Sequence, residues 1–194
     1  MSFVYAVRCN FSRPDLEDRW HAWYNGPKTD EMLAKPGFLS GQRFRAAGMD
    51  QTIAYLALWV LESPAALKTP AYTSQWGFAD WSAHVKDWSR NLYRAPDGDT
   101  CALVDVPAGG GLHFVAYEAV PEAEAEVCCL DMHAKHPQLT WMPVVGLDRS
   151  CGIIGLRVFP DMQRLPSLLF EGAAPGIRET IYRPVSAQRR AGSG

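Results

Sequence analysis

Hydrophobic and polar residues follow two different periods in the first half of the chain. Residues 3–11 alternate between the two classes, which predicts a strand. Apolar residues then recur at i, i+4, i+7 and i+8, the spacing of one helical face: Leu16, Trp20, Trp23 and Tyr24. The Gly26-Pro27 pair is expected to interrupt this helix, because proline cannot donate its backbone hydrogen bond. Further strands are expected at residues 39–45, 52–61 and 89–94, with a helix restarting at residues 62–64.

The second half repeats this order of elements. Strands are expected at residues 112–120, 142–147, 152–159 and 180–183, with helices at 121–135 and 165–171. Both halves also end on an aliphatic-Tyr-Arg sequence, at residues 92–94 and 181–183. The pattern predicts an α+β protein made of two fused ferredoxin-like (βαββαβ) repeats, whose antiparallel sheets pack as an α+β barrel.

Composition shifts suggest where one repeat ends and the other begins. We expect residues 1–96 to form the first repeat, which contains an aromatic insertion and the active site. Residues 97–111 are rich in glycine, proline and aspartate and are expected to be a linker. Residues 112–186 would form the second repeat, and residues 187–194 are expected to be a disordered tail.

Charge and cysteine usage exclude several classes of function. The net charge of the 194-residue chain is −2, so no field would attract nucleic acid or an anionic membrane. The beginning of the chain has no leader pattern and no apolar run is long enough to span a membrane, so a cytoplasmic location is expected. Five cysteines without a CxxC argue against a disulfide framework and against structural zinc. Nucleotide-binding and serine-hydrolase motifs are absent, and no cofactor is expected.

Residues 17–44 carry a family resemblance. The segments in question are Trp23-Tyr24-Asn25, Glu31-Met32-Leu33, Pro36-Gly37-Phe38 and Arg43-Phe44. Together they resemble the EthD-like branch of the dimeric α+β barrel superfamily. The family's characteristic histidine is replaced here by Lys28, its neighbouring acid by Asn25, and the proline after the histidine by Asp30.

The resemblance implies a broad range of functions. Members of the superfamily include cofactor-independent monooxygenases, muconolactone-type isomerases, polyketide cyclases, decarboxylases and heme-binding proteins. Relatives usually pair two chains through their sheets, so the fused halves here are expected to form an internal pseudo-dimer, with further homodimerisation left open. A small molecule is the expected partner.

An aromatic segment at residues 69–81 distinguishes the first repeat from the second. Aromatic walls with a few polar groups are typical of small-molecule pockets. The substrate-binding candidates are Trp23, Tyr72, Trp76, Trp81 and Trp88. The alternative is a core helix in which tryptophan is only a filler.

Five residues are candidates for catalysis. Lys28 lies beside aromatic residues that would lower the pKa of its ammonium group, which favours a base or an amine nucleophile. The alternative is an exposed lysine that pairs with Asp30 or Glu31. Tyr24 and Asn25 could orient a substrate oxygen, or could simply pack at the end of a helix.

Arg43 and His84 complete this set. Arg43 and Arg45 share one strand face, so they could grip a carboxylate or enolate, or could lie on a solvated face. His84 precedes Trp88 by four residues and is placed on the same helical face as a general acid or base, with a structural role as the alternative. His21 is expected to face away from the apolar stripe.

A histidine pair in the second half is weighed as a metal site. His133 and His136 follow Cys129 on a predicted helix, but no distant third or fourth ligand accompanies them. Cationic residues at a helix end suit the helix dipole, so the structural interpretation is preferred and no metal ligand is predicted.

Three functions remain open from the sequence. The first is a cofactor-independent enzyme that acts by proton transfer on a small oxygenated or aromatic ring compound, of the isomerase, lyase, dehydratase or decarboxylase type. The second is a cofactor-free monooxygenase of the same superfamily. The third is a non-catalytic protein that binds a small molecule.

Overall fold

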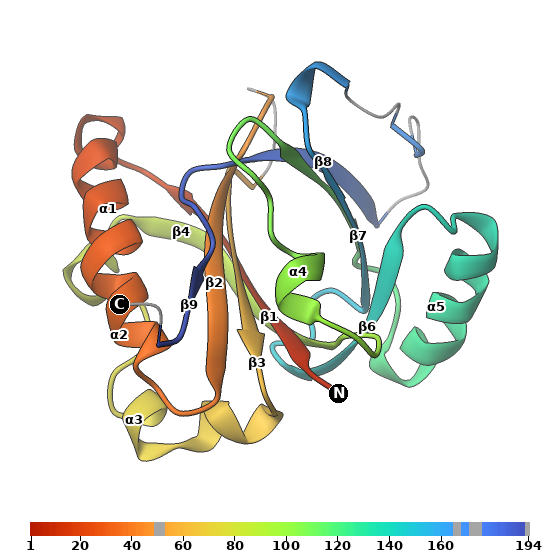
Figure 1. Cartoon of the computed structure of the whole chain (residues 1–194), viewed down its shortest axis with the longest axis horizontal. Helices are drawn as coiled ribbons and strands as arrows, with labels where there is room; N and C mark the ends of the chain where they lie inside the picture. Colours follow the sequence, from red (N-terminus) through yellow and green to blue (C-terminus); the bar gives the residue numbers. More distant parts are fainter. Residues whose placement is uncertain (49–52, 165–167, 171–175, 193–194) are drawn as a thin grey trace.

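A computed structural model describes residues 1–48, 53–164, 168–170 and 176–192. Within these residues, eight antiparallel strands close into a barrel (Figure 1). The first repeat contributes β1 (Phe3–Phe11), β2 (Phe38–Ala46), β3 (Tyr55–Leu61) and β4 (Val85–Arg94). The second repeat contributes β5 (Gly111–Tyr117), β6 (Thr140–Leu147), β7 (Ile153–Phe159) and β8 (Ile177–Pro184).

The strand order confirms the predicted fold class. The first repeat has the order β4-β1-β3-β2, and the second has the equivalent order β8-β5-β7-β6. The barrel closes where β2 pairs with β8 and β4 pairs with β6. The two ferredoxin-like sheets are therefore joined edge to edge within one chain.

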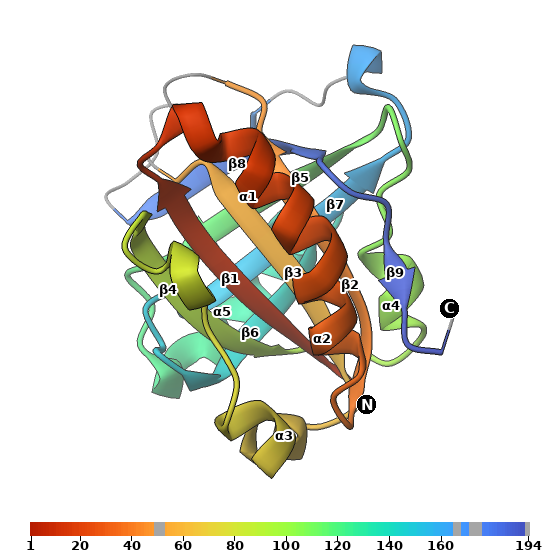
Figure 2. The same cartoon turned by 90° about the vertical axis from the view of Figure 1, so that its left-hand side faces the viewer.

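Helices cover the outer face of the barrel. In the first repeat the chain runs through η1 (Pro14–Leu16), α1 (Glu17–Trp23), η2 (Tyr24–Lys28) and α2 (Thr29–Leu33). These elements run along the outer face of the sheet, in front of β3 and between β1 and β2, as Figure 2 shows, and α2 contacts β2. In the second repeat α5 (Glu122–Lys135) packs against β6. Short helical turns complete the structure: η3 (Pro64–Lys68), α3 (Pro70–Thr73), η4 (Ala79–Trp81), α4 (Thr100–Leu103) and η5 (Met162–Arg164).

The predicted break at Gly26-Pro27 is a widened turn rather than an end. Residues Tyr24–Lys28 form a π-helical turn, and the helix continues on both sides of it. The hydroxyl of Thr29 donates a hydrogen bond of 2.7 Å to the carbonyl oxygen of Tyr24. Single π turns inside α-helices occur often at functional sites.

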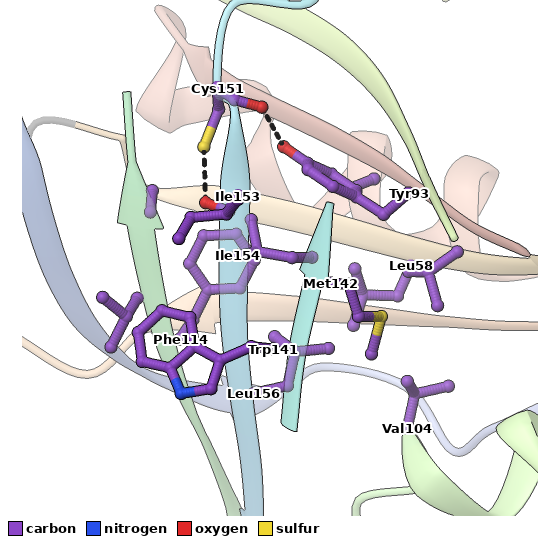
Figure 3. Packing of buried hydrophobic residues seen from close by; sticks show 14 of the residues in the cluster. Leu58, Tyr93, Val104, Phe114, Trp141, Met142, Cys151, Ile153, Ile154 and Leu156 are labelled. Carbon is purple, nitrogen blue, oxygen red and sulfur yellow. Dashed lines mark hydrogen bonds between the residues drawn. The ribbon is translucent and has the colours of Figure 1, made fainter. Parts of the chain in front are cut away.

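The interior of the barrel is filled by apolar side chains from both repeats. Because side chains alternate along a strand, Val4 and Ala6 of β1 point into the barrel with Leu58, Phe114 and Ile154. Figure 3 shows this packing, with the Tyr93 hydroxyl donating to the carbonyl oxygen of Cys151 at 3.3 Å. These side chains of the described residues fill the interior, whereas the pockets described below are lined by residues on the outer side of the sheet.

The connector and the C-terminal segment are both more ordered than the sequence suggests. The side-chain amide of Gln42 pairs with both backbone groups of Val106, at 2.8 and 2.9 Å, and holds the connector to β2. The prediction of a disordered tail is wrong for residues 187–192, because β9 (Arg189–Arg190) pairs with Ser40 and Gly41 of β2. The helix predicted at 165–171 lies largely outside the described residues. The predicted domain limits stay predictions.

No helix in the described part of the chain is both long and apolar enough to cross a membrane.

Candidate functional site

The main pocket, named so because it is aromatic and more enclosed than two larger, open hollows among the described residues, lies on the outer face of the first repeat's sheet, beneath η2, α2 and the aromatic segment. It has about 350 Å³ of space, part of which is open to solvent. Strand alternation supplies its floor, because Tyr5 and Val7 of β1 point away from the barrel interior that Val4 and Ala6 fill. The lining residues are Tyr5, Val7, Tyr24, Lys28, Met32, Trp59, Tyr72, Trp76, Gly77, Phe78, Trp88 and Arg90.

Lys28 is buried at the end of the π-helical turn, with 5% of its surface exposed. Its Nζ donates to Oε1 of Glu31 at 2.9 Å, and the Nζ of Lys35 lies 3.0 Å from the same oxygen. Burial lowers the pKa of Lys28, and the hydrogen bond with Glu31 offsets this only in part. The alternative is therefore right about the pairing with Glu31 and wrong about exposure, because Lys28 is buried.

Glu31 joins two buried lysines at the edge of this pocket. Burial alone would raise the pKa of Glu31, but the hydrogen bonds from Lys28 and Lys35 lower it overall. One quarter of the Glu31 side chain is exposed, so the carboxylate reaches from the pocket edge to solvent. Lys35 is also tied to the carbonyl oxygen of Ala71 at 3.0 Å and does not line the pocket.

Three phenol groups supply hydrogen-bonding capacity in the pocket. The hydroxyls of Tyr5 and Tyr72 are 3.0 Å apart and buried. Burial raises the pKa of Tyr5 and of Tyr24 well above the ordinary value, so both phenols stay protonated at neutral pH and can act as donors. Among the described residues, the buried indole N–H of Trp59 has no regular hydrogen-bond partner.

Arg90 and two tryptophans form the mouth of the pocket. The guanidinium carbon of Arg90 lies 4.3 Å from the ring centroid of Trp76 and 5.6 Å from that of Trp88. Both rings are partly exposed, at 45% and 43%. Nη2 of Arg90 is 3.6 Å from Oδ1 of Asp148, which is beyond hydrogen-bonding distance.

Arg43 is buried but does not line the main pocket. Its Nη1 donates to Oδ1 of Asn25 at 2.7 Å and lies 3.2 Å from Nδ1 of His21. Among the described residues, Arg43 has no carboxylate partner. Burial lowers its pKa to about 10.

A second, smaller pocket surrounds this guanidinium. Its lining residues are Val7, Cys9, Trp20, Tyr24, Arg43, Tyr55, Leu56 and Ala57. Because Tyr24 and Val7 line both pockets, the Tyr24 ring is a shared wall. Arg45 points to the same side of β2, as predicted, but is partly exposed and lies 3.4 Å from Glu17.

The prediction that His21 faces away from the apolar stripe is wrong: its ring contacts Trp20 and Tyr55, and its Nδ1 joins the polar network of Arg43. Burial is the largest cause that lowers its pKa to about 4, and the charge of Arg43 adds to it. His21 is therefore a neutral acceptor at physiological pH. A signal for it does exist in the sequence, because His21 and Asn25 are four residues apart and share the helix face that meets Arg43.

Two predicted wall residues lie outside the main pocket. Trp81 packs against Trp23, with ring centroids 6.2 Å apart, and against Phe11 at 5.9 Å. Neither Trp23 nor Trp81 lines the main pocket, whereas Tyr72, Trp76 and Trp88 do.

The predicted helical face that joins His84 to Trp88 is wrong. β4 begins at Val85, so Trp88 lies on a strand and His84 precedes it in a turn. The His84 ring contacts Phe11, with centroids 6.1 Å apart, and its carbonyl oxygen accepts the Ser12 hydroxyl. The spacing of four residues does not place His84 and Trp88 on one helical face, because the short turn η4 ends at Trp81 and the chain continues into β4.

The histidines of the second half are not grouped for metal binding. Within the described residues, no three or more His, Cys, Asp or Glu side chains come together in a way that could hold a metal ion. His133 is exposed on α5, while His136 packs against Phe170 with ring centroids 4.8 Å apart.

In the second repeat, a histidine and a glutamate occupy the positions equivalent to two polar residues of the main pocket. Aligning the ends of the β1–β3 and β5–β7 ladders matches Tyr5 with His113 and Arg90 with Glu179. Nε2 of His113 contacts Oε1 of Glu179, whose carboxylate also accepts the backbone N–H of Leu169 at 2.8 Å. A buried histidine–carboxylate pair thus replaces the phenol and the cation of the first repeat.

Comparisons with known proteins place the fold. No family model and no curated protein matches the sequence. An anthrone oxidase-like protein of known structure superposes with a TM-score of 0.57 and 11% identity, over 99% of this chain and 94% of that one. A proposed monooxygenase from Fusobacterium nucleatum gives a TM-score of 0.51 and 9% identity, over 100% and 94%. A variant chlorite dismutase from Candidatus Nitrospira defluvii gives a TM-score of 0.50 and 8% identity, over 93% of this chain and 90% of that one. The chain therefore shares with these proteins an antiparallel α+β barrel fold, with both halves of the barrel in one polypeptide.

Proposed function

We propose that the main pocket binds a small aromatic compound that carries oxygen and that Lys28 removes a proton from it. The observation that carries this proposal is the burial of Lys28 at an aromatic pocket, where its pKa is lowered and its Nζ is bound by Glu31. A lysine whose pKa is lowered by burial holds more of the neutral amine near neutral pH, the form that accepts protons.

Each neighbouring group has a role in this chemistry. After proton transfer the Lys28 ammonium is stabilised by Glu31 at 2.9 Å, and the partly exposed Glu31 carboxylate provides a route for the proton to solvent. The hydroxyl of Tyr24, and whichever hydroxyl of the Tyr5–Tyr72 pair does not donate to the other, can donate hydrogen bonds to the negative charge that develops on a substrate oxygen. The tryptophans and Phe78 exclude water from the reacting atoms.

The reaction class that fits these groups is cofactor-independent proton transfer, of the isomerase, lyase, dehydratase or decarboxylase type. The similarity of residues 17–44 to the EthD-like branch is part of this proposal. Arg43 acts as a positioning residue in this proposal, because it contacts Tyr24 and Asn25 and does not line the main pocket. His84 lies outside the pocket and is given no role.

Cofactor-free oxygenation is the second candidate, and it is favoured by two of the fold neighbours. One is anthrone oxidase-like and one is a proposed monooxygenase. An activated methylene that loses a proton to Lys28 becomes an enolate, which can transfer electrons to dioxygen. Overall the methylene loses two hydrogens and gains one oxygen as a carbonyl, while the second oxygen leaves as water. Four electrons pass from carbon to dioxygen.

Hydrogen–deuterium exchange tests the proton-transfer step directly. The probes are anthrone and 2-tetralone, each of which has an acidic C–H, in deuterated buffer under nitrogen. We expect the wild-type protein to accelerate exchange at that position. Lys28→Met should lower the enzymatic rate by about 100-fold or more, the usual contribution of a general base.

Lys35→Met is the matched control. Both variants remove a buried ammonium group from Oε1 of Glu31, but only Lys28 lines the pocket. Lys35→Met should therefore keep exchange within a few-fold of wild type. Equal rates in wild type and Lys28→Met would contradict the assignment of the base. Saturable binding of both probes without any acceleration would indicate a binding protein.

Admitting dioxygen to the same samples distinguishes the two reaction classes. Uptake of one dioxygen per anthrone consumed, lost in Lys28→Met, would establish oxygenation. Exchange without dioxygen uptake would restrict the activity to proton transfer.

A further inference from the structure

We propose that the natural ligand of the main pocket is an anion, an aromatic ring with a carboxylate that binds to Arg90. This inference rests on the proposed function, since it assigns a substrate class to the same pocket. It concerns the mouth of the pocket, whereas the proton transfer concerns Lys28.

The charges of the lining residues point to an anion. Two of the lining side chains, Lys28 and Arg90, are cationic, and none of the lining residues is an acid. The remaining polar lining groups are the phenols and the indole N–H groups, which can all donate hydrogen bonds. The two cations would repel a cationic ligand, and a neutral ligand would offer these donors fewer and weaker acceptors than an anion does.

Arg90, rather than Lys28, is the cation without full compensation. The ammonium of Lys28 is bound by Glu31 at 2.9 Å. Nε of Arg90 is buried and has no partner among the described residues. Asp148 forms a loose ion pair with Arg90, because its Oδ1 stays 3.6 Å from Nη2 and its Oδ2 accepts the backbone N–H of Arg90 at 2.7 Å. This pair leaves Nε without a hydrogen bond.

An acceptor on the ligand would satisfy this guanidinium. A buried donor without a partner has lost its water without gaining a hydrogen bond, and the cost is larger for a charged group. A carboxylate matches the planar fork of a guanidinium better than other common anions, because two parallel N–H groups can donate to its two oxygens.

The aromatic part of the ligand follows from the neighbours of Arg90. Trp76 and Trp88 lie over the guanidinium, and the Phe78 ring is 6.2 Å from Trp88. The floor beyond them is formed by the rings of Tyr5 and Trp59. A flat ring would stack among these side chains while its carboxylate faces Arg90.

The test compares 2-naphthoate with its neutral isostere 2-naphthamide. Binding of each to the full-length protein is measured by calorimetry at pH 7.5, with tryptophan fluorescence as a second signal. We expect naphthoate to bind at least about tenfold more tightly than the amide, as a charge-assisted hydrogen bond provides.

Three variants connect the preference to Arg90. Arg90→Gln should bind the two compounds equally, and Arg90→Lys should keep only part of the preference because it lacks the fork. Arg157→Gln removes an exposed arginine from β7 of the second repeat and should behave as wild type. Thermal unfolding of each variant shows that it is folded.

The outcomes distinguish this inference from the proposed function. Equal, saturable binding of both compounds to the wild type would overturn the anion assignment and leave the pocket in place. If folded Arg90→Gln kept the wild-type preference for naphthoate over the amide, Arg90 would not be the residue that binds the carboxylate. Failure of the wild type to bind either compound would count against the pocket itself.

Discussion

The guanidinium of Arg43 lies against the ring of Tyr24, with its central carbon 3.9 Å from the ring centroid. The ring of Trp20 is also near it, at 4.6 Å. The cation therefore contacts aromatic faces and the neutral acceptors Asn25 and His21. Among the described residues, no carboxylate pairs with it. In a buried place such a charge acts strongly on its neighbours, because little water screens it.

Replacing this charge should raise the pKa of His21. In the wild type that pKa is lowered to about 4, by burial first and by Arg43 next. Arg43→Met removes the charge that faces Nδ1 at 3.2 Å, so the pKa should move up toward the ordinary value of 6.5. An NMR titration of the His21 ring protons measures it.

Arg45→Met is the control for this experiment. Arg45 also lowers the pKa of His21, but about half of its side chain is exposed and water screens its charge. Its replacement should move the His21 titration less than Arg43→Met does. An equal shift in both variants would show that the Arg43 contact has no special effect.

The stability of the protein should fall as the pH is lowered from about 7 to 5. The pKa values of His21 and His113 are both lowered in the folded state, in each case chiefly by burial. Below an unfolded pKa of about 6.5, the unfolded chain binds protons that the folded chain does not, so acid favours unfolding. The slope is at most about 1.4 kcal/mol per pH unit for each histidine.

Urea denaturation at half-unit pH intervals measures this dependence. His21→Gln removes one of the two groups, so the slope between pH 6.5 and 5 should be smaller in that variant. A stability that is flat or rises over this interval in the wild type would show that neither histidine is kept neutral by the fold.

The fold could be predicted because its signals are local. The alternation at residues 3–11 coincides with β1, and the helix predicted at 121–135 coincides with α5 to within one residue. Burial of one strand face and one helix face leaves this period in the sequence. β9 was not predicted because two arginines carry no such period, and their pairing depends on the part of β2 that β8 leaves unpaired.

The site could be predicted only in part, because its members meet across long separations. Lys28, Tyr24 and Tyr72 were found from their aromatic neighbourhood in the sequence. In the sequence, Arg90 is one residue of the strand predicted at 89–94. The neighbouring residues along the chain do not indicate that Trp76 lies over it. For the same reason the sequence could not tell that Tyr24 stands between Arg43 and the main pocket.

Glu31→Gln should affect both stability and the pH dependence of proton transfer. The variant leaves the buried Lys28 and Lys35 facing a neutral amide, and we expect the free energy of unfolding to fall by about 2 kcal/mol. Without the carboxylate, the pKa of Lys28 should fall further. The neutral, basic form would then persist to lower pH, and the acidic limb of the exchange-rate profile should move to lower pH.

Urea denaturation and the deuterium-exchange assay measure these two effects. Asp131→Asn is the comparison, because it breaks an exposed pair with Lys135 and should change stability by less than about 0.5 kcal/mol. If Glu31→Gln were as mild as Asp131→Asn and left the rate profile in place, Glu31 would not control the charge of Lys28.

Two glycines covered by tryptophans offer a test of the pocket floor. Gly41 pairs across the ladder with Trp59, and Gly155 pairs in the same way with Trp141 of the second repeat. A Cβ on Gly41 would collide with the Trp59 ring, and one on Gly155 would lie 2.8 Å from the Trp141 ring. We expect Gly41→Ala and Gly155→Ala each to lower the free energy of unfolding by about 1–3 kcal/mol, the usual cost of overpacking.

Only one of these variants should weaken ligand binding. Trp59 lines the main pocket and is 1% exposed, so a displaced ring must move into the space where the ligand binds. Gly41→Ala should therefore bind 2-naphthoate at least about tenfold more weakly, whereas Gly155→Ala should bind it as the wild type does. Trp59→Phe, which keeps the glycine, tests the same wall without overpacking. Wild-type affinity in both Gly41→Ala and Trp59→Phe would mean that the ligand does not reach the Trp59 ring.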